Sequence, residues 1–296
     1  MKALTRTIWT EEDYEFLKNN YLELTNRQIG EKIGKTKSAI QNKLKILGLN
    51  RPEKNIYNHD FFENINSKEK AYWLGFIYAD GYISKSERSY CCGIELKESD
   101  IGHLIKFNKS IGGNIKPSSR KRENELLGEN NVCYIRLYSK KMFFDLKKHG
   151  CVERKSDKIR MPDIDKRYMW DFIRGYFDGD GCIVLNKSRL CPQFDFCSSS
   201  LLMLEEVKTF LFSCGIYSHI QEQGKYNKKI KNKIPNYRLY ICGMENGNIF
   251  AKYLYSDATI FLDRKYYKWL NIAKEYNIEN RINNRNHGGV RHKIKS

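Results

Sequence analysis

Apolar residues spaced three and four apart near the start of the chain predict three short helices within residues 8–49. In the third helix, Ile40, Leu44 and Leu47 share one face. The positions between them are polar or charged, so each helix has one face to bury against the others. The pattern therefore predicts a small all-α trihelical domain over residues 1–50.

Beyond a predicted linker at residues 51–66, the same order of elements occurs twice. The first set comprises a helix at 68–80, strands near 82–85 and 90–97, a helix at 99–111, strands near 113–121 and 131–138, and a helix at 140–149. The second set comprises a helix at 167–180, strands near 182–187 and 193–198, a helix at 200–214, strands near 217–225 and 236–242, and a helix at 245–255. We therefore predict an α+β fold with two pseudo-symmetric α-β-β-α-β-β-α repeats. The first repeat covers 67–163, the second covers 164–280, and a basic tail follows at 281–296.

The predicted first helix of each repeat ends in the same short motif. Residues 73–81 read WLGFIYADG, and residues 173–181 read IRGYFDGDG. Small residues four apart in each helix allow two helix backbones to approach closely. These helix-packing residues are Gly75 and Ala79 in the first copy and Gly175 and Gly179 in the second. The glycine that ends each motif is expected to adopt a positive φ just past the helix.

Asp80 and Asp180 come directly before these final glycines, at the predicted C-terminal ends of the two helices. The helix dipole is negative there and disfavours a carboxylate by about 0.3–1 kcal/mol. Two such carboxylates brought together also repel each other unless a cation lies between them. Oxygen ligands suit Mg²⁺, with Mn²⁺ as an alternative. An aspartate before a glycine also occurs as simple turn chemistry, but two copies in matching context favour a metal site.

The two motifs resemble those of the LAGLIDADG family of homing endonucleases, in its two-motif, monomeric type. Both copies keep the two glycines and the penultimate acid of the family motif. The resemblance implies that Asp80 and Asp180 are catalytic and bind metal, together with the backbone near Ala79 and Gly179. It also implies two curved sheets that lie on the DNA major groove. The family often has a basic residue near each site, and Arg136 and Arg238 are the symmetric candidates, although lysine is more typical.

Composition supports a polyanionic partner. The chain holds 53 Lys and Arg against 35 Asp and Glu, a net charge of +18. No apolar run approaches the 18 residues of a membrane span, and no lipidation signal stands out. The nine cysteines include no C-x-x-C pair, and the start of the chain does not read as a signal peptide. We therefore expect a protein that is neither secreted nor in a membrane, located in the cytoplasm or an organellar matrix near the nucleoid.

The third predicted helix of the N-terminal domain is a candidate DNA reader, because this domain is similar to helix-turn-helix and Myb-type units. Its outward residues are Lys37, Gln41, Asn42 and Lys45. Side chains of these types bind phosphates and base edges in a major groove. The alternative is a small helical domain with a solvated polar face.

Strand alternation predicts that one face of each sheet packs on helices and the other faces nucleic acid. Arg, Lys and Gln on that free face are candidate DNA contacts. In the first repeat these candidates are Lys85, Lys116, Arg120 and Arg136. In the second repeat they are Lys187, Arg189, Gln193, Gln221, Gln223, Lys225 and Arg238.

These features predict a metal-dependent DNA endonuclease, encoded in an intron, that hydrolyses one phosphodiester in each strand of a long duplex site. Because the two repeats differ in sequence, a monomer should read an asymmetric target. One alternative is an RNA maturase that uses the same fold to bind intron RNA and assist splicing. A second alternative is a DNA-binding regulator that does not cut, and retention of both aspartates argues against it.

Overall fold

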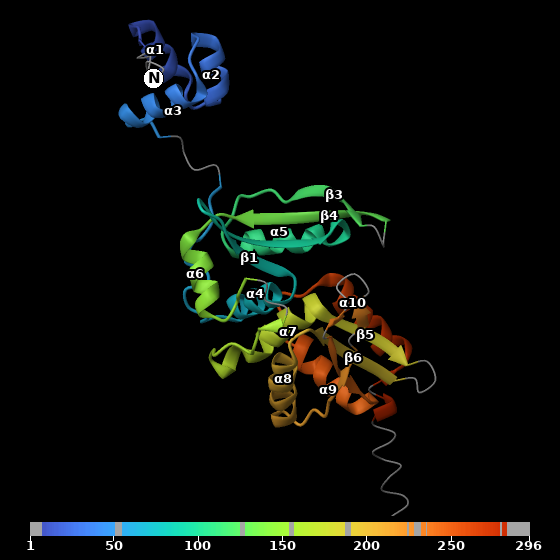
Figure 1. Cartoon of the computed structure of the whole chain (residues 1–296). Helices are drawn as coiled ribbons and strands as arrows, with labels where there is room; N and C mark the ends of the chain where they lie inside the picture. The colour runs from blue at the N-terminus through green and yellow to red at the C-terminus, as the bar shows by residue number, and fades with distance from the viewer. Residues whose placement is uncertain are drawn as a thin grey trace, which may run out of the picture. The chain divides into compact units, whose positions relative to one another are not determined.

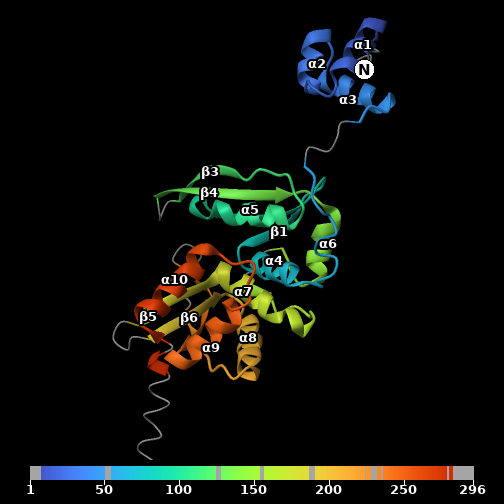
Figure 2. The same ribbon diagram turned by 180° about the vertical axis from the view of Figure 1, so that it is seen from behind.

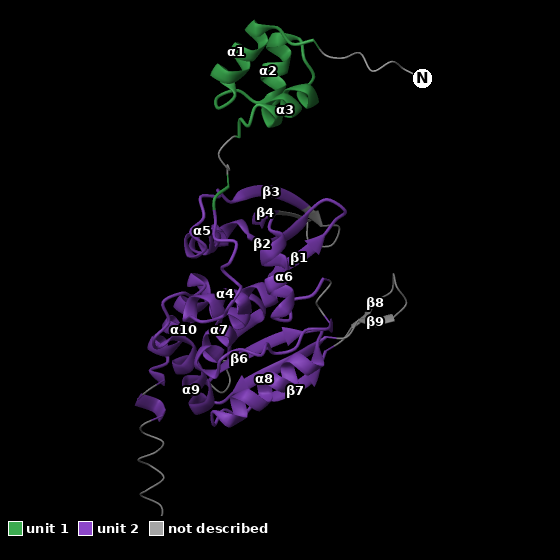
Figure 3. Cartoon of the chain, turned by 90° about the vertical axis from the view of Figure 1, so that its left-hand side faces the viewer, with its two compact units in different colours: residues 1–56 green, residues 57–296 purple. Residues whose placement is uncertain are grey.

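The computed structural model describes residues 8–50, 55–124, 128–153, 157–186, 191–223, 225–227, 232–234, 236–278 and 280–282. The chain divides into two compact units, an N-terminal unit at Met1–Ile56 and a C-terminal unit at Tyr57–Ser296 (Figure 3). Each unit has its own hydrophobic core. None of the helices that the structure describes combines the length and the apolar character needed to cross a bilayer.

The N-terminal unit consists of three helices, as predicted. They are α1 at Glu11–Asn20, α2 at Asn26–Ile33 and α3 at Lys37–Ile46. Each begins at a threonine whose hydroxyl accepts a hydrogen bond from the first turn, and the first two form complete capping boxes. The core of this unit consists of Leu17, Ile29, Ile40 and Leu44.

The C-terminal unit contains the predicted repeat twice (Figure 1). The first repeat comprises α4 at Lys68–Ala79, β1 at Gly81–Lys85, β2 at Tyr90–Lys97, α5 at Ile101–Ser110, β3 at Ser118–Asn124, β4 at Gly128–Leu137 and α6 at Lys140–Lys148. The second comprises α7 at Met169–Asp180, β5 at Gly181–Asn186, β6 at Cys191–Ser198, α8 at Leu201–Ser213, β7 at His219–Glu222, β10 at Tyr237–Cys242 and α9 at Met244–Tyr255. A small ribbon of β8 at Lys225–Asn227 and β9 at Asn232–Ile234 is inserted, and α10 at Asp263–Glu275 follows. The α+β fold is therefore confirmed.

Each repeat builds one antiparallel four-stranded sheet, in the order β1-β2-β4-β3 in the first and β5-β6-β10-β7 in the second. Along each strand, alternate residues enter the core, as Ile94 and Ile135 do in the first sheet. The opposite side of each sheet is its outer face. Helices α4 and α7 lie side by side between the two sheets (Figures 1 and 2).

The structure differs from the sequence prediction between residues 57 and 66. The sequence predicts a linker here, but Tyr57, Phe61, Phe62 and Ile65 are buried in the core of the C-terminal unit. The many asparagines in this stretch favour a linker in the sequence, although its apolar residues pack into the core. Of the predicted linker residues that precede this packed segment, the structure describes residues 55 and 56.

The glycines after the two motifs also differ from expectation, because neither Gly81 nor Gly181 has a positive φ. Gly181 is extended, with φ −84° and ψ 165°, and each glycine begins a strand at once. A Cβ on Gly81 would lie 2.7 Å from the Cα of Ile77, and one on Gly181 would overlap Phe177. These positions require glycine because the strand leaves against the last turn of its own helix.

Candidate functional site

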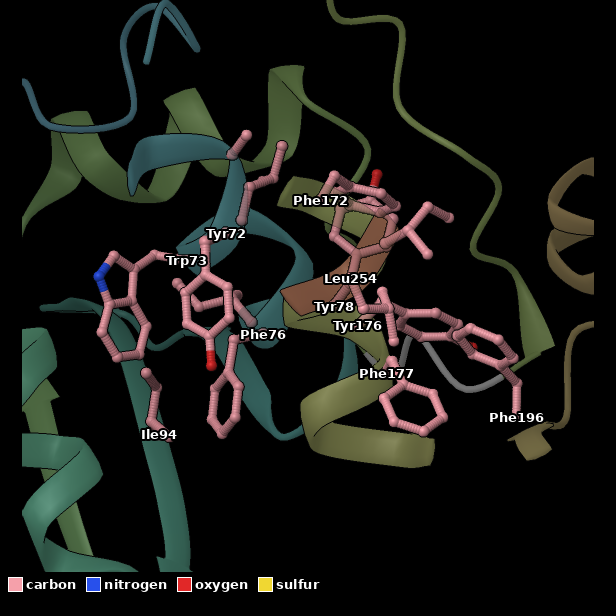
Figure 4. Packing of buried hydrophobic residues seen from close by; sticks show 14 of the residues in the cluster. Tyr72, Trp73, Phe76, Tyr78, Ile94, Phe172, Tyr176, Phe177, Phe196 and Leu254 are labelled. Carbon is pink, nitrogen blue, oxygen red and sulfur yellow. The ribbon is translucent and has the colours of Figure 1, made fainter. Parts of the chain in front are cut away.

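Helices α4 and α7 pack backbone against backbone at Gly75 and Gly175. A Cβ on Gly75 would overlap the carbonyl oxygen of Phe172, and a Cβ on Gly175 would overlap that of Tyr72. Large aromatic side chains from both helices surround this contact (Figure 4). The predicted close approach of the two motif helices is therefore present, and its symmetry brings their C-terminal ends together.

Asp80 caps α4, and Asp180 is the last residue of α7. The two helix ends touch, since a Cβ on Gly179 would overlap the Cβ of Ala79 and lie 3.4 Å from Oδ2 of Asp80. Each aspartate is followed directly by the first strand of its sheet. The structure thus places both carboxylates where the two sheets meet the paired helices.

Lys265 of α10 lies at the same helix ends and was not foreseen from the sequence. It is only 4% exposed, and its Nζ donates to the carbonyl oxygens of Phe177 at 2.7 Å and Gly179 at 3.1 Å. Burial lowers its pKa from 10.5 to about 8, while neighbouring carboxylates, Asp80 and Asp180 among them, act in the opposite direction. One sequence signal could have revealed it. Lys265 has helical spacing to Trp269 and Ile272, so a lysine occupies a core position.

A fully buried carboxylate, Asp178, joins this region to α4. It accepts hydrogen bonds from the hydroxyl of Tyr72 at 2.7 Å, the backbone N–H of Leu262 at 2.8 Å and the hydroxyl of Tyr255 at 3.3 Å. Burial raises its pKa, and the nearby ammonium of Lys265 acts against that rise. Since Leu262 precedes α10, Asp178 fixes the start of the helix that carries Lys265.

The oxygen atoms at the two helix ends fit a hard divalent cation. Mg²⁺ is typically held by one or two carboxylates together with substrate phosphates and water, and Asp80 and Asp180 supply two carboxylates. Within the described residues, no group of three or more His, Cys, Asp or Glu side chains forms a metal cluster. The carbonyl of Gly179 was a predicted ligand, and the structure shows that it accepts from Lys265.

Several predicted DNA contacts lie on the outer faces of the sheets. In the first sheet, Arg136 donates from Nε to the hydroxyl of Tyr82 at 3.2 Å, and Arg120 pairs with Glu95. In the second, the guanidinium of Arg238 pairs with Asp195. Lys116, Gln221, Gln223, Gln193 and Arg238 are exposed or partly exposed.

Arg136 and Arg238 were also candidates for the basic residue beside each aspartate. In the structure, Arg136 contacts Tyr82 and Arg238 contacts Asp195, so each is held on its sheet by a strand neighbour. Lys265 is a further basic residue at the helix ends, and the roles of Arg136 and Arg238 beside the aspartates stay predictions. The sequence suggests the two arginines because an arginine occurs at the same place in both repeats. Lys265 lies beyond the last repeated element, so the repeat gives no signal for it.

Lys85 departs from its predicted place on the DNA side. It lies two residues after Ile83 on β1, so its side chain points to the same face of the sheet as that buried residue. Its Nζ lies over the ring of Tyr90. Tyr90 in turn packs on Phe143 of α6, so Lys85 lies at the helix-covered side of the sheet edge. Lys187 and Arg189 lie outside the described residues, and the side chain of Lys225 does as well.

In the N-terminal unit, α3 exposes one polar face. Its residues Lys37, Gln41, Asn42 and Lys45 are all exposed, while Ile40 and Leu44 are buried. Lys43 is on a different side of α3, where its Nζ donates to the hydroxyl of Tyr14 and lies over the Trp9 ring. The exposed set therefore forms a continuous surface that no core contact uses.

Comparison with known proteins finds one matching family model and several relatives of low sequence identity. The model of a family described as a LAGLIDADG-like domain matches residues 167–255. A probable translation initiation factor IF-2 of Methanocaldococcus jannaschii is 28% identical over 180 residues, which are 59% of this chain and 14% of that protein. The uncharacterized protein MJ0398 of the same organism is 24% identical over 76% of this chain and 83% of that protein. The NrdEB subunit alpha of ribonucleoside-diphosphate reductase from Bacillus subtilis (strain 168) is 23% identical over 64% of this chain and 19% of that protein. The chain thus spans less than a fifth of the initiation factor and of the reductase subunit.

Two solved structures are also similar. The homing endonuclease I-WcaI bound to its DNA recognition sequence has a TM-score of 0.47 and 20% identity, covering 76% of this chain and 97% of that one. The LAGLIDADG meganuclease I-AabMI bound to uncleaved DNA has a TM-score of 0.45 and 11% identity, covering 71% of this chain and 90% of that one.

Proposed function

We propose that this chain is a site-specific DNA endonuclease that hydrolyses one phosphodiester in each strand of a duplex, a proposal that the match of residues 167–255 to the model of a LAGLIDADG-like domain supports. The observation that carries the proposal is the paired helix ends. Two equivalent helices meet at Gly75 and Gly175 and bring Asp80 and Asp180 to one place. A binding protein gains nothing from two carboxylates beside a phosphate backbone.

The two aspartates are the proposed metal ligands and catalytic residues. A divalent cation bound there supplies a Lewis acid for the phosphate and lowers the pKa of a bound water. Asp80 ends the motif helix of the first repeat and Asp180 ends that of the second, so each would serve one DNA strand. Their fixed position at the start of β1 and β5 orients the carboxylates relative to the sheets.

Lys265 is a further proposed catalytic residue. A lysine with a pKa of about 8 is partly neutral near physiological pH, and its Nζ can then accept a proton from the attacking water. Its hydrogen bonds to the carbonyls of Phe177 and Gly179 hold that Nζ beside Asp180. In the proposed hydrolysis, Lys265 is therefore a proton acceptor whose position is fixed by the backbone of α7.

The outer faces of the two sheets are the proposed DNA surface, and their different side chains favour an asymmetric target read by a monomer. The exposed face of α3, with Lys37, Gln41, Asn42 and Lys45, is proposed as a second DNA contact. A net charge of +18 supports binding to a polyanion over either surface.

A cleavage selection tests the proposal. The full chain is incubated with Mg²⁺ and a randomised duplex library, and the cleaved ends are sequenced. We expect one recurrent site, absent from reactions with EDTA and from reactions with the Asp80→Asn, Asp180→Asn double variant. Asp60→Asn, at an exposed position on the surface, is the matched control and should cut normally.

Cleaved ends without a recurrent site, or cleavage by the double variant at the normal rate, would refute the endonuclease proposal. Retention of intron RNA in preference to duplex DNA in a competition gel shift would favour the maturase function instead.

A further inference from the structure

The outer face of the first sheet carries an organised group of arginines. Arg120 donates from Nη2 to Oε2 of Glu95 at 2.5 Å, and Arg122 donates from Nη1 to Oε1 of the same carboxylate at 3.2 Å. The guanidinium carbons of Arg120 and Arg136 lie 5.6 and 4.6 Å from the centroid of the Tyr134 ring. One carboxylate and one ring therefore fix the directions of these side chains.

Arg136 is held from its other side by Tyr82. The hydroxyl of Tyr82 accepts from Nε at 3.2 Å, and within the part of the chain that the structure describes the two terminal Nη groups of Arg136 remain as donors for a ligand. Gly93 makes this contact possible, because Tyr82 lies across it and a Cβ there would come 2.6 Å from the Tyr82 hydroxyl. The absence of a side chain at Gly93 on β2 thus leaves room for the ring of Tyr82, which orients Arg136.

These groups line a shallow hollow with a volume of 420 Å³ on the outer face. Its lining includes Tyr82, Ser84, Glu95, Arg120, Arg136 and Tyr138. Hydroxyl groups and charged side chains supply its polar atoms, and it bears more cationic than anionic groups. Such a surface is suited to an electron-rich edge with two neighbouring acceptors, rather than to an apolar ligand.

In the DNA major groove, the edge with two neighbouring acceptors is that of guanine, whose O6 and N7 bind one arginine through two donors. We propose that Arg120 and Arg136 each read a guanine in the half-site under the first sheet, with Glu95 and Tyr82 as their positioning residues. This inference rests on the proposed function and adds the base identity that the first repeat selects.

The spacing of the two arginines limits where the guanines lie. Because both guanidinium carbons lie close to one Tyr134 ring, they are at most about 10 Å apart, which is about three base-pair steps of B-DNA. The two guanines are therefore expected in the same half-site, within about three base pairs of each other, on either strand.

The second sheet differs at the corresponding place. The carboxylate of Asp195 is only 3% exposed and accepts both from Arg238 and from Nε2 of Gln193 at 2.9 Å. The described part of that outer face also presents Gln221, and glutamine pairs with adenine. The paired guanines should accordingly mark the half of the target that the first repeat covers.

A binding selection tests this inference separately from cleavage. The Asp80→Asn, Asp180→Asn chain is used so that bound DNA stays intact, and a randomised duplex library is enriched by gel shift and sequenced. We expect two guanines within about three base pairs in one half-site. Arg136→Gln and Arg120→Gln should each abolish the preference at one of them, a loss of about 5- to 150-fold in relative binding.

Glu95→Gln should weaken the preference only at the position lost in Arg120→Gln, which a general loss of folding would not do. Lys85→Gln, at the helix-covered edge, is the matched control and should leave the selected site unchanged. An enriched site whose guanine preferences persist in both arginine variants would overturn the inference while leaving the endonuclease proposal intact. A library without any enriched duplex would overturn both.

Discussion

The hydroxyl of Tyr72 on α4 donates a 2.7 Å hydrogen bond to the buried carboxylate of Asp178 on α7. The pseudo-symmetric pair has no such bond. There, the ring of Phe172 meets the ring of Tyr78 edge to face, with centroids 5.1 Å apart. The two repeats are thus joined by a polar contact on one side of their shared helix pair and by an aromatic contact on the other.

Replacing Tyr72 with phenylalanine should destabilise the C-terminal unit by about 1–3 kcal/mol, because Asp178 then loses a donor while it stays buried. The same hydroxyl also lies 3.0 Å from Nε2 of His103, so a second partner is lost. Urea unfolding followed by fluorescence measures the change. Tyr138→Phe, at an exposed tyrosine, is the control and should unfold like the wild type. Equal midpoints for all three proteins would show that the Tyr72 bond contributes nothing.

A Gly75→Ala substitution should force α4 and α7 apart, since its Cβ would overlap the Phe172 carbonyl. Overpacking of this kind costs about 1–3 kcal/mol, and here it also moves the ends that carry Asp80 and Asp180. We expect lower stability and slower cleavage together. Gly102→Ala in α5 provides the opposite control, because its Cβ would meet nothing within 4 Å. That variant should be at least as stable as the wild type, because alanine has the higher helix preference. A stable, fully active Gly75→Ala chain would contradict the packing argument.

Asp80→Asn and Asp180→Asn should each leave the duplex nicked in one strand, because each aspartate is proposed to serve one strand. Supercoiled plasmid carrying the selected site reports this directly, since nicked and linear products separate on a gel. Binding should persist in both variants. Linear product at the wild-type rate from either single variant would refute the assignment of that aspartate.

Lys265→Met should slow cleavage by about 10²- to 10⁴-fold if Nζ accepts the proton of the attacking water. In the wild type, the single-turnover rate should rise with pH and level off above about 8, where the amine is neutral. Lys274→Met, near the end of the same helix, is the control. A pH profile unchanged between Lys265→Met and the wild type would exclude the proton-accepting role.

His103 should make the protein less stable in acid. Burial lowers its pKa to about 3, whereas a histidine in the unfolded chain titrates near 6.5. Between these values the unfolded chain binds a proton that the folded chain does not, so stability falls as pH is lowered, by up to about 1.4 kcal/mol per pH unit. His103→Gln should flatten this dependence. Unfolding titrations at several pH values from 4 to 7 compare the slopes, and parallel curves would contradict the prediction.

Local signals predicted the fold well because they repeat. The spacing of apolar residues in the helices, the small residues four apart within each motif helix and the alternation along the strands are all set by residues close in sequence. The segment at 57–66 was missed because its apolar residues pack on elements that lie far along the chain. Lys265 was missed for the same reason, since its partners at Phe177 and Gly179 are brought to it only by folding. The positive φ expected for the final glycines was wrong because glycine there avoids a clash and does not turn the chain.

The direct passage from motif helix to first strand has a consequence for how such a protein changes its target. Asp80 is followed at once by β1, and Asp180 by β5, with no loop between them. For the proposed endonuclease, the offset between the phosphate at each aspartate and the first base under its sheet would therefore be set by the backbone. Under the proposed function, substitutions on the outer faces would alter which bases are accepted and would leave the spacing between the two cuts unchanged.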